Sequence, residues 1–301
     1  MKVLITGATG LVGKEIVKQL LVKDVSVNYL TTSKRKIENS HNYNGYYWNP
    51  ETGEVDSQCL EGVLAIINLA GSSIAQRWTS FNKKSILNSR INSLKTLKQL
   101  LNKEVHTVSH IISASAIGIY PNSLTNFYDE NYNDISDTFL GDVVKLWEEE
   151  VDKFETININ VSKIRIGLVL DNNAGALPQI VKPVKYGVGA AFGNGQQWQS
   201  WIHKTDLAKL FLYVLKNKIT GIINGVAPNP VTNSELTKAV ATVLRRPLIL
   251  PNIPKSMMKL ILGEMHILLF ESQRVSSKKI EEKGFDFKHP NIKPALSDLL
   301  Q

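Results

Sequence analysis

The chain opens with Met1–Gly13, MKVLITGATGLVG. Lys2–Thr6 is a short apolar run of the kind that forms a buried strand. Glycines follow at positions 7, 10 and 13, and an amphipathic stretch that predicts a helix comes directly after them. A strand, this glycine spacing and a helix are together typical of a turn that binds the diphosphate of a dinucleotide. The alternative is a glycine-rich turn that holds no ligand.

Each glycine has a separate expected role in such a turn. Gly7 allows the tight turn that leaves the strand, Gly10 keeps a side chain out of the path of the diphosphate, and Gly13 lets the helix pack closely. The helix N-terminus then presents free N–H groups and the positive end of its dipole to the phosphates. The expected cofactor contacts in the turn are Gly7, Thr9, Gly10, Leu11, Val12 and Gly13.

The composition is that of an ordinary globular protein: of 301 residues, 43% are hydrophobic and 21% are charged. The net charge of +8 suits an anionic ligand such as a nucleotide phosphate. Basic residues are scattered apart from Lys34–Lys36, so we expect no nucleic-acid partner. Cys59 is the only cysteine, which leaves no disulfide framework and no cysteine-based metal site. No other metal-ligand spacing stands out. The single cysteine fits a location in the reducing cytoplasm.

Neither a signal peptide nor a membrane span is expected. A predicted strand begins at once, and the apolar run at 260–270 is broken by Gly263, Glu264 and His266. That run is too short and too polar to cross a bilayer. We therefore expect a small-molecule substrate and no membrane partner, and the sequence leaves the oligomeric state open.

Strand and helix patterns alternate through the first half of the chain. Strands are expected at Val25–Leu30, Val63–Leu69, His110–Ser113 and Val161–Leu170, and helices at Asn82–Leu101 and Asp142–Phe154. Alternation of this kind predicts right-handed crossovers and a doubly wound parallel sheet of the α/β class. We assign the dinucleotide-binding domain to residues 1–170 and a smaller substrate lobe with a C-terminal helical region to residues 171–301.

Glycine and proline become frequent after Asp171, which indicates loops and short elements. Helices are expected at Asp206–Leu215, Thr232–Leu244 and Ile292–Leu300, with Asp206 and either Thr232 or Asn233 as N-caps. A short strand at Ile222–Val226 has the option of returning to the main sheet.

The residues at the end of the second strand determine the preference for NAD or NADP, because NAD-binding proteins place a carboxylate there for the ribose hydroxyls. Here the chain reads Leu30–Arg35, LTTSKR, with no carboxylate. Thr32 and Ser33 offer hydroxyls, and Lys34 or Arg35 offers charge to a 2′-phosphate. The sequence thus favours NADP over NAD, the alternative being a solvated basic loop. Further expected contacts at the ends of later strands are Leu69, Ala70, Gly71 and Ser113.

Motifs from one end of the chain to the other carry a family resemblance. They include TGATGLVG at 6–13, INLAG at 67–71, SASAIGIY at 113–120, RIGLVL at 165–170, WIHKTDL at 201–207, NGVAPNPVT at 224–232, SQRV at 272–275 and GFDF at 284–287. With these motifs the chain resembles the atypical extended short-chain dehydrogenases/reductases. Within that class it is similar to the NAD(P)-dependent epimerase-family proteins that end in a C-terminal domain of unknown function. The resemblance implies a Rossmann domain and a relation to nucleoside-diphosphate-sugar epimerases.

The wider class uses a serine, a tyrosine and a lysine for proton transfer. Its serine corresponds to Ser115, whose alternative role is a strand-end hydroxyl bonded to the backbone. The helix that begins near Gly141 has no tyrosine at either possible register, so the usual Tyr-x-x-x-Lys pair is missing. Lys145 stands where the lysine belongs, or is a solvated helix lysine. Tyr120 is the nearby phenol that would replace the missing acid, unless it packs under its loop.

The remaining polar residues are candidates for substrate binding. Arg77 and Arg90 are suited to an anionic group because guanidinium binds it bidentately, the alternative being an internal salt bridge. Gln197 and Trp201 are expected to line the cleft, and His203 is either a substrate contact or a buried, hydrogen-bonded histidine. The function expected is that of an NADP-dependent oxidoreductase or epimerase-like enzyme acting on a small polar substrate, a class that includes nucleotide-linked molecules. The alternative is a non-catalytic NADP(H)-binding redox or metabolite sensor.

Overall fold

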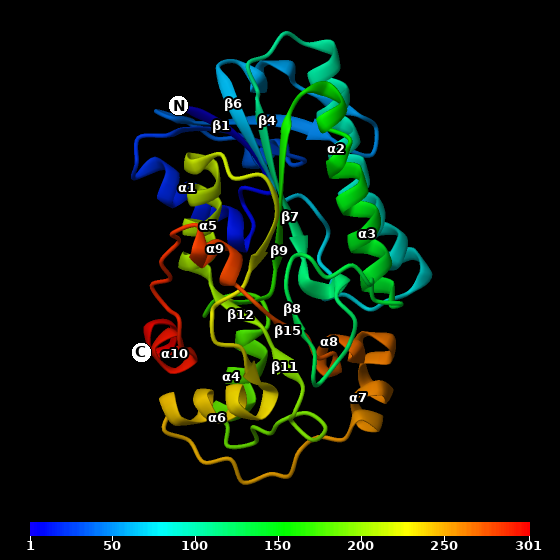
Figure 1. Cartoon of the computed structure of the whole chain (residues 1–301), viewed down its shortest axis with the longest axis vertical. Helices are drawn as coiled ribbons and strands as arrows, with labels where there is room; N and C mark the ends of the chain where they lie inside the picture. The colour runs from blue at the N-terminus through cyan, green and yellow to red at the C-terminus, as the bar shows by residue number, and fades with distance from the viewer.

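A mostly parallel sheet occupies one half of the computed structural model, which describes residues 1–301 (Figure 1). Its strands are β1 (Lys2–Thr6), β2 (Ser26–Thr31), β3 (Asn39–Ser40), β4 (Tyr43–Asn49), β5 (Glu54–Val55), β6 (Val63–Asn68), β7 (His110–Ala116), β9 (Asn160–Ile166) and β13 (Gly221–Gly225). They lie in the order β13-β9-β7-β6-β1-β2-β4-β3, with β5 paired to β4. Only β3 and β5 are antiparallel to their neighbours, so the predicted doubly wound α/β sheet is confirmed.

Helices cover both faces of this sheet. On one face α1 (Leu11–Leu21) lies beside α5 (Lys204–Asn217), and on the other α2 (Ser80–Lys103) lies beside α3 (Phe139–Asp152) (Figure 1). The central strands are buried on both sides, which explains why they read as continuous apolar runs. Each fully buried aliphatic side chain contributes about 1.5–3 kcal/mol, so the sheet is a firm platform for the loops at its edge.

The strand expected at Val161–Leu170 is interrupted at Gly167, which corrects the prediction. β9 ends at Ile166, and β10 (Leu168–Leu170) pairs with β12 (Trp201–His203) in a separate small sheet. A Cβ on Gly167 would stand 2.2 Å from the Ser200 carbonyl oxygen, so only glycine allows the chain to cross here. The expected return strand is present as β13, which pairs with β9 in parallel.

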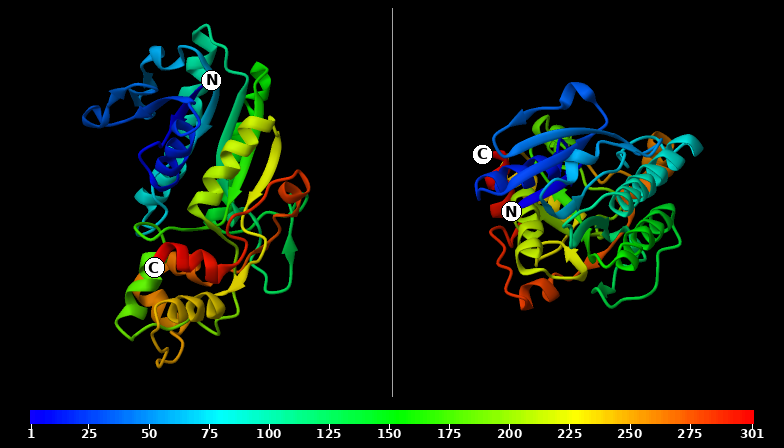
Figure 2. Two further views of the ribbon diagram at one scale, coloured as in Figure 1. Left: turned by 90° about the vertical axis from the view of Figure 1, so that its left-hand side faces the viewer. Right: turned by 90° about the horizontal axis from the view of Figure 1, so that it is seen from above.

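The second half of the molecule is a smaller helical lobe below the sheet (Figure 2). Its helices are α4 (Leu177–Lys185), α6 (Asn233–Val243), α7 (Lys255–Leu262), α8 (Ile267–Phe270) and α10 (Ile292–Leu300). Short strand pairs join β11 (Trp198–Gln199) to β14 (Val231–Thr232) and β8 (Phe127–Tyr128) to β15 (Arg274–Val275), and α9 (Lys278–Glu282) packs near β13. Thr232 caps α6 through a reciprocal box with Glu235, in agreement with the sequence. No helix is both long enough and apolar enough to cross a bilayer.

Asp206 does not cap α5, contrary to expectation. The cap is His203, whose Nδ1 accepts a hydrogen bond from the Thr205 N–H at 3.1 Å. The Asp206 carboxylate instead accepts from the backbone N–H groups of Lys288 and His289, at 3.0 and 2.7 Å. These partners are more than 80 residues away along the chain, beyond the reach of a local capping pattern. Asp206 therefore ties the C-terminal segment to α5.

Candidate functional site

A cleft of about 900 Å³ opens at the carboxyl ends of β1, β2 and β6. The strand order runs in opposite directions on the two sides of β1, and ligands of open α/β sheets bind at such a switch point. One wall consists of strand-end residues and the other of one face of α2. The lining includes Gly7, Thr9, Thr31, Thr32, Ser33, Lys36, Ala70, Gly71, Ser72, Lys84, Ser85, Asn88, Ser89 and Asn92. The volume lies within the range of about 300–1,000 Å³ that is usual for small-molecule and cofactor sites.

The glycine turn has the geometry that a phosphate site requires. Gly7 has φ of +71°, and a Cβ there would stand 2.9 Å from the Leu69 carbonyl oxygen. At Gly13 a Cβ would stand 2.2 Å from the Gly7 carbonyl oxygen, so the helix rests directly on the turn. The first bond into α1 runs from the Lys14 N–H to the Gly10 carbonyl. The N–H groups of residues 11–13 therefore have no acceptor within the helix, and the first turn contains no acidic side chain to repel an anion.

At the end of β2 one of the three adjacent basic residues lines the cleft, and it is not one of the two expected from the sequence. Thr32, Ser33 and Lys36 line the cleft, whereas Lys34 and Arg35 do not. Residues 34–36 form a single 3₁₀ turn, which places Lys34 over the Tyr47 ring, with Nζ 4.9 Å from its centroid. The sequence alone does not show which of these three adjacent basic residues lines the cleft, because that depends on the conformation of this turn.

Ser113 helps to shape the cleft from below. It is fully buried, and its Oγ accepts from Asn68 Nδ2 at 3.1 Å. Asn68 Oδ1 in turn accepts from Thr6 Oγ1, which also accepts from the N–H groups of Leu69 and Ala70. This network joins the ends of three neighbouring strands and fixes the loop that forms one edge of the cleft.

Ser115 and Tyr120 belong to a buried polar network on the α3 side of the sheet. Ser115 Oγ donates to Glu148 Oε1 at 2.5 Å, and Arg165 binds the same carboxylate with Nε and Nη2 at 2.8 and 2.9 Å. The Tyr120 hydroxyl donates to Asn224 Oδ1 at 2.8 Å and accepts from Arg165 Nη1 at 3.1 Å. Burial raises the pKa of Tyr120. Neither hydroxyl lines the cleft.

Lys145 is exposed on the outer side of α3. With Tyr120 it borders a cavity of about 230 Å³ that shares no lining residue with the cleft. The structure therefore does not gather Ser115, Tyr120 and Lys145 around one point that faces the cleft.

A smaller, mostly apolar cavity of about 210 Å³ lies at the carboxyl ends of β7 and β9. It is bordered by residues 116–118 and 166–168, by Leu140, Val143 and Trp147 of α3, and by Leu268, Glu271 and Gln273 of the C-terminal region. Among the substrate residues expected from the sequence, only Arg90 lines it. Trp198–Ser200 border it in place of the expected Gln197 and Trp201.

Arg90 has no acidic partner, which rules out the salt bridge considered for it. Its Nη1 donates to the carbonyl oxygens of Ser72 and Ile86 at 3.2 and 2.8 Å, and its guanidinium lies 4.9 Å from the Trp147 ring centroid. Its Nε is buried without a hydrogen-bond partner. Burial lowers the pKa of Arg90 to about 10. A half-buried cation with no acidic partner and a buried, unpaired Nε favours an anionic or oxygen-bearing ligand.

The other predicted substrate residues lie elsewhere. Arg77 is exposed and borders neither the cleft nor the smaller cavity. Gln197 Nε2 donates to the carbonyl oxygens of Phe192 and Leu269, and Trp201 Nε1 donates to that of Asn229 at 2.9 Å. Both side chains are buried and hold the small lobe together.

Comparisons with known proteins agree with this architecture. The model of the NAD dependent epimerase/dehydratase family matches residues 3–225, and a domain of unknown function (DUF1731) matches residues 253–299. The chain belongs to the NAD dependent epimerase/dehydratase family. Epimerase family protein YfhF of Bacillus subtilis is 36% identical over 301 residues, which cover 100% of this chain and 98% of that protein.

Two solved structures relate this family member to bound cofactors. Human epimerase family protein SDR39U1 with NADPH has a TM-score of 0.85 and 26% identity, and the alignment covers 99% of each chain. MoeE5 in complex with UDP-glucuronic acid and NAD has a TM-score of 0.77 over 99% of this chain and 97% of that one, but only 15% identity, so it supports the fold alone. The chain is thus a member of the epimerase family and has the extended short-chain dehydrogenase/reductase fold of these two cofactor-bound proteins.

In this epimerase-family chain, the DUF1731 region forms part of the cavity wall through Leu268, Glu271 and Gln273. Neither Glu271 nor Lys36 was among the residues expected at the site. Glu271 precedes a recognised motif without belonging to it, and no spacing relates it to strand ends more than 100 residues earlier.

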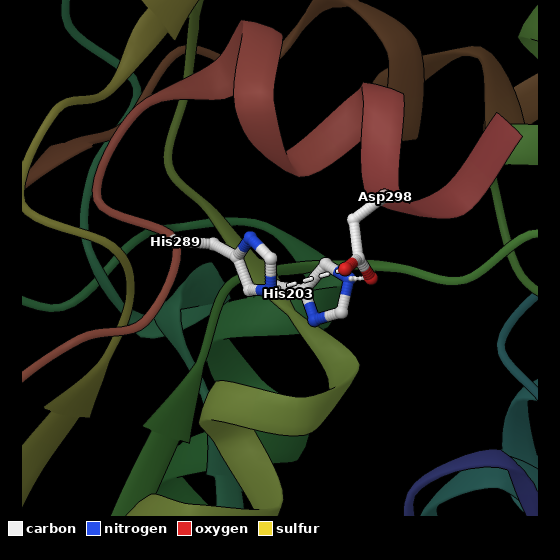
Figure 3. A group of neighbouring side chains, drawn as sticks. All are labelled: His203, His289 and Asp298. Atoms are coloured by element: carbon white, nitrogen blue, oxygen red, sulfur yellow. Dashed lines mark ion pairs between the residues drawn. The ribbon is translucent and has the colours of Figure 1, made fainter. Parts of the chain in front are cut away.

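His203, His289 and Asp298 form a compact cluster between α5 and α10, with one ligand atom from each within 4.8 Å of the others (Figure 3). The two imidazole rings stack with centroids 4.0 Å apart, and His203 Nε2 lies 3.4 Å from Asp298 Oδ2. Because His203 Nδ1 accepts from Thr205, the neutral ring carries its proton on Nε2 and has no lone pair there for a cation. One imidazole and one carboxylate remain, fewer than the three or four protein ligands of typical zinc sites. The cluster joins the C-terminal helix to α5.

Proposed function

We propose that this chain binds NADP(H) in the cleft and acts as an oxidoreductase or epimerase-like enzyme on a small polar molecule held in the neighbouring cavity. The observation that carries the proposal is the position of Arg90. Its Nη1 binds the carbonyl of Ser72, a residue of the cleft wall, while its side chain also lines the cavity. One residue thus separates a cofactor-sized space from a substrate-sized space at the same edge of the sheet.

The chain's own groups fit the nucleotide. The free N–H groups of residues 11–13 and the dipole of α1 would hold the diphosphate, and Gly7 would leave it room. Thr32, Ser33 and Lys36 would hold the 2′-phosphate that distinguishes NADP from NAD. When bound, the nicotinamide supplies or accepts a hydride. Glu51 also lines the cleft from the turn between β4 and β5, which makes a direct comparison of NADPH with NADH necessary.

The second candidate, a non-catalytic NADP(H) sensor, is favoured by the bond from Ser115 to Glu148. The Ser115 hydroxyl, which would align a substrate in an enzyme of this class, is instead bonded within a structural network. Under this alternative, nucleotide binding persists without turnover.

Calorimetry with purified protein tests the nucleotide part of the proposal. We expect NADPH to bind more tightly than NADH, and Lys36→Ala to weaken NADPH binding about tenfold while leaving NADH unaffected. Arg35→Ala is the matched control, since Arg35 does not line the cleft. Equal affinity for both nucleotides would contradict the assignment of the 2′-phosphate site.

Turnover separates the two functional candidates. An oxidoreductase is expected to oxidise NADPH with at least one member of a panel of small aldehydes, ketones and oxo-acids, and an epimerase-like enzyme is expected to interconvert a sugar nucleotide without net oxidation. Stoichiometric binding with neither reaction would favour the sensor.

A further inference from the structure

The smaller cavity contains an acidic group that none of the functional assignments above uses. Glu271 follows α8, and its Oε2 accepts from Gln273 Nε2 at 3.1 Å. Its Oε1 is buried and has no hydrogen-bond partner. An unsatisfied carboxyl oxygen is costly in a buried site, unless a ligand completes its hydrogen bonding or it carries a proton.

The backbone around Glu271 is held firmly. The Glu271 N–H donates to the Ile267 carbonyl, and the Ser272 N–H donates to Asn122 Oδ1 at 2.8 Å. Gln273 Nε2 also donates to the Tyr120 carbonyl at 3.3 Å. The carboxyl is thus presented from a fixed segment, as a group that acts on a ligand must be.

The surroundings of this carboxyl favour its protonated form. Leu140, Val143 and Leu268 line the same cavity. Burial raises the pKa of Glu271 against the interactions with the side chains of Gln273 and Thr138, which lower it. The negative charge of Asp137, ahead of α3, also raises the pKa, and Arg90 of α2 lines the same cavity. No ion pair joins Arg90 to Glu271, so each retains bonding capacity for a ligand in the cavity that both line.

We propose that Glu271 is the proton donor and acceptor of the cavity, in the role of the tyrosine absent from α3, and that Arg90 binds a second oxygen group of the same substrate. This inference rests on the proposed function. A volume of about 210 Å³ lies below the usual range of about 300–1,000 Å³ and so favours a compact molecule. The substrate class is a small carbonyl compound, or its alcohol, that carries a carboxylate or similar oxygen group.

The proton balance follows from this arrangement. In the reducing direction the O–H bond of the Glu271 carboxyl breaks, and its proton forms the O–H bond of the product alcohol. The hydride for the carbonyl carbon would come from a bound, reduced nicotinamide dinucleotide, and the carboxylate would regain a proton from water. In the oxidising direction the Glu271 carboxylate takes the proton of the substrate hydroxyl.

A binding measurement tests this role without knowledge of the substrate. The oxidised nicotinamide is positively charged and favours a nearby carboxylate over a carboxylic acid, whereas the reduced ring is neutral. Titration calorimetry at pH 6.5 in two buffers of different ionisation enthalpy, PIPES and imidazole, gives the protons released on binding. We expect more release with NADP⁺ than with NADPH. Both nucleotides carry the same phosphates, so proton uptake by those groups cancels in the difference.

Variants assign the effect to Glu271. Glu271→Gln should abolish the difference in proton release and keep NADPH affinity within about threefold, whereas Glu271→Asp should keep a difference. Glu282→Gln, an exposed change in the same C-terminal region, should behave as the wild type. A difference that survives in Glu271→Gln, or that is absent from a wild type that binds both nucleotides, overturns this inference alone. A wild type that binds neither nucleotide overturns the proposed function and this inference with it.

Discussion

Arg90 donates a hydrogen bond from Nη1 to the Ser72 carbonyl oxygen at 3.2 Å, and this contact forms the boundary between the cleft and the smaller cavity. The side chain also fills the space beside Gly71, where a Cβ would stand 3.1 Å from the Arg90 Cζ. The guanidinium from α2 therefore helps to position the loop that follows β6, together with the hydrogen bonds that join Ser72 to Ser85 and Ser89.

Replacement of Arg90 should loosen that loop. Arg90→Met keeps much of the volume but leaves the Ser72 carbonyl without this donor, a loss worth about 1–3 kcal/mol. We expect NADPH affinity to fall about tenfold by calorimetry. Arg77→Met, at an exposed arginine outside both spaces, is the control and should leave affinity unchanged. An Arg90→Met variant with wild-type affinity would show that the loop is positioned by other contacts.

Gly13 should tolerate no side chain. In Gly13→Ala the new methyl group meets the Gly7 carbonyl oxygen at 2.2 Å, so the first turn of α1 must move away from the glycine turn. Overpacking of this kind costs about 1–3 kcal/mol. We expect a lower free energy of unfolding in urea and a loss of NADPH affinity of about 30-fold or more. Lys14→Ala, at the next and exposed position, should change neither quantity by much.

The network of Ser115, Glu148 and Arg165 should contribute more to stability than to nucleotide binding. Ser115→Ala leaves the two bonds from Arg165 to the Glu148 carboxylate intact and should cost about 1 kcal/mol. Glu148→Leu leaves the buried Arg165 without its counter-charge and should cost about 3–5 kcal/mol. Urea unfolding measures both changes. If Ser115→Ala instead removes NADPH oxidation without affecting stability, the hydroxyl acts on the substrate.

The features that could be predicted from the sequence are those that depend on residues close together in the chain. The glycine turn, the buried strands and the Thr232 cap were predictable because each depends on residues within one turn or one strand. Asp206, Lys36 and Glu271 depend on contacts that local patterns do not encode. Asp206 binds a segment more than 80 residues away, Lys36 is selected by a 3₁₀ turn, and Glu271 reaches a cavity formed mainly by α3 and the ends of β7 and β9. The absence of a tyrosine from α3 could be seen in the sequence, but a candidate to replace it could be identified only from the fold.

Acid should destabilise the protein through two buried histidines. His110 donates from Nε2 to Ser162 Oγ, which itself donates to the Ile219 carbonyl, and burial lowers the pKa of His110 from 6.5 to about 4. Burial and the neighbouring His289 likewise lower the pKa of His203 to about 4. Between these pKa values the unfolded chain binds protons that the folded chain does not. Stability is therefore complete above pH 6.5 and is lost as the pH falls toward 4.

The expected loss is about 2 kcal/mol per ring between pH 7 and pH 5. Urea unfolding at the two pH values measures it. His110→Gln keeps a donor toward Ser162 and should reduce the loss by about 2 kcal/mol, because one titrating ring is removed. His41→Gln, at an exposed histidine, should leave the loss unchanged. Equal losses in His110→Gln and in the wild type would mean that the His110 ring accepts its proton as readily in the folded protein as in the unfolded chain.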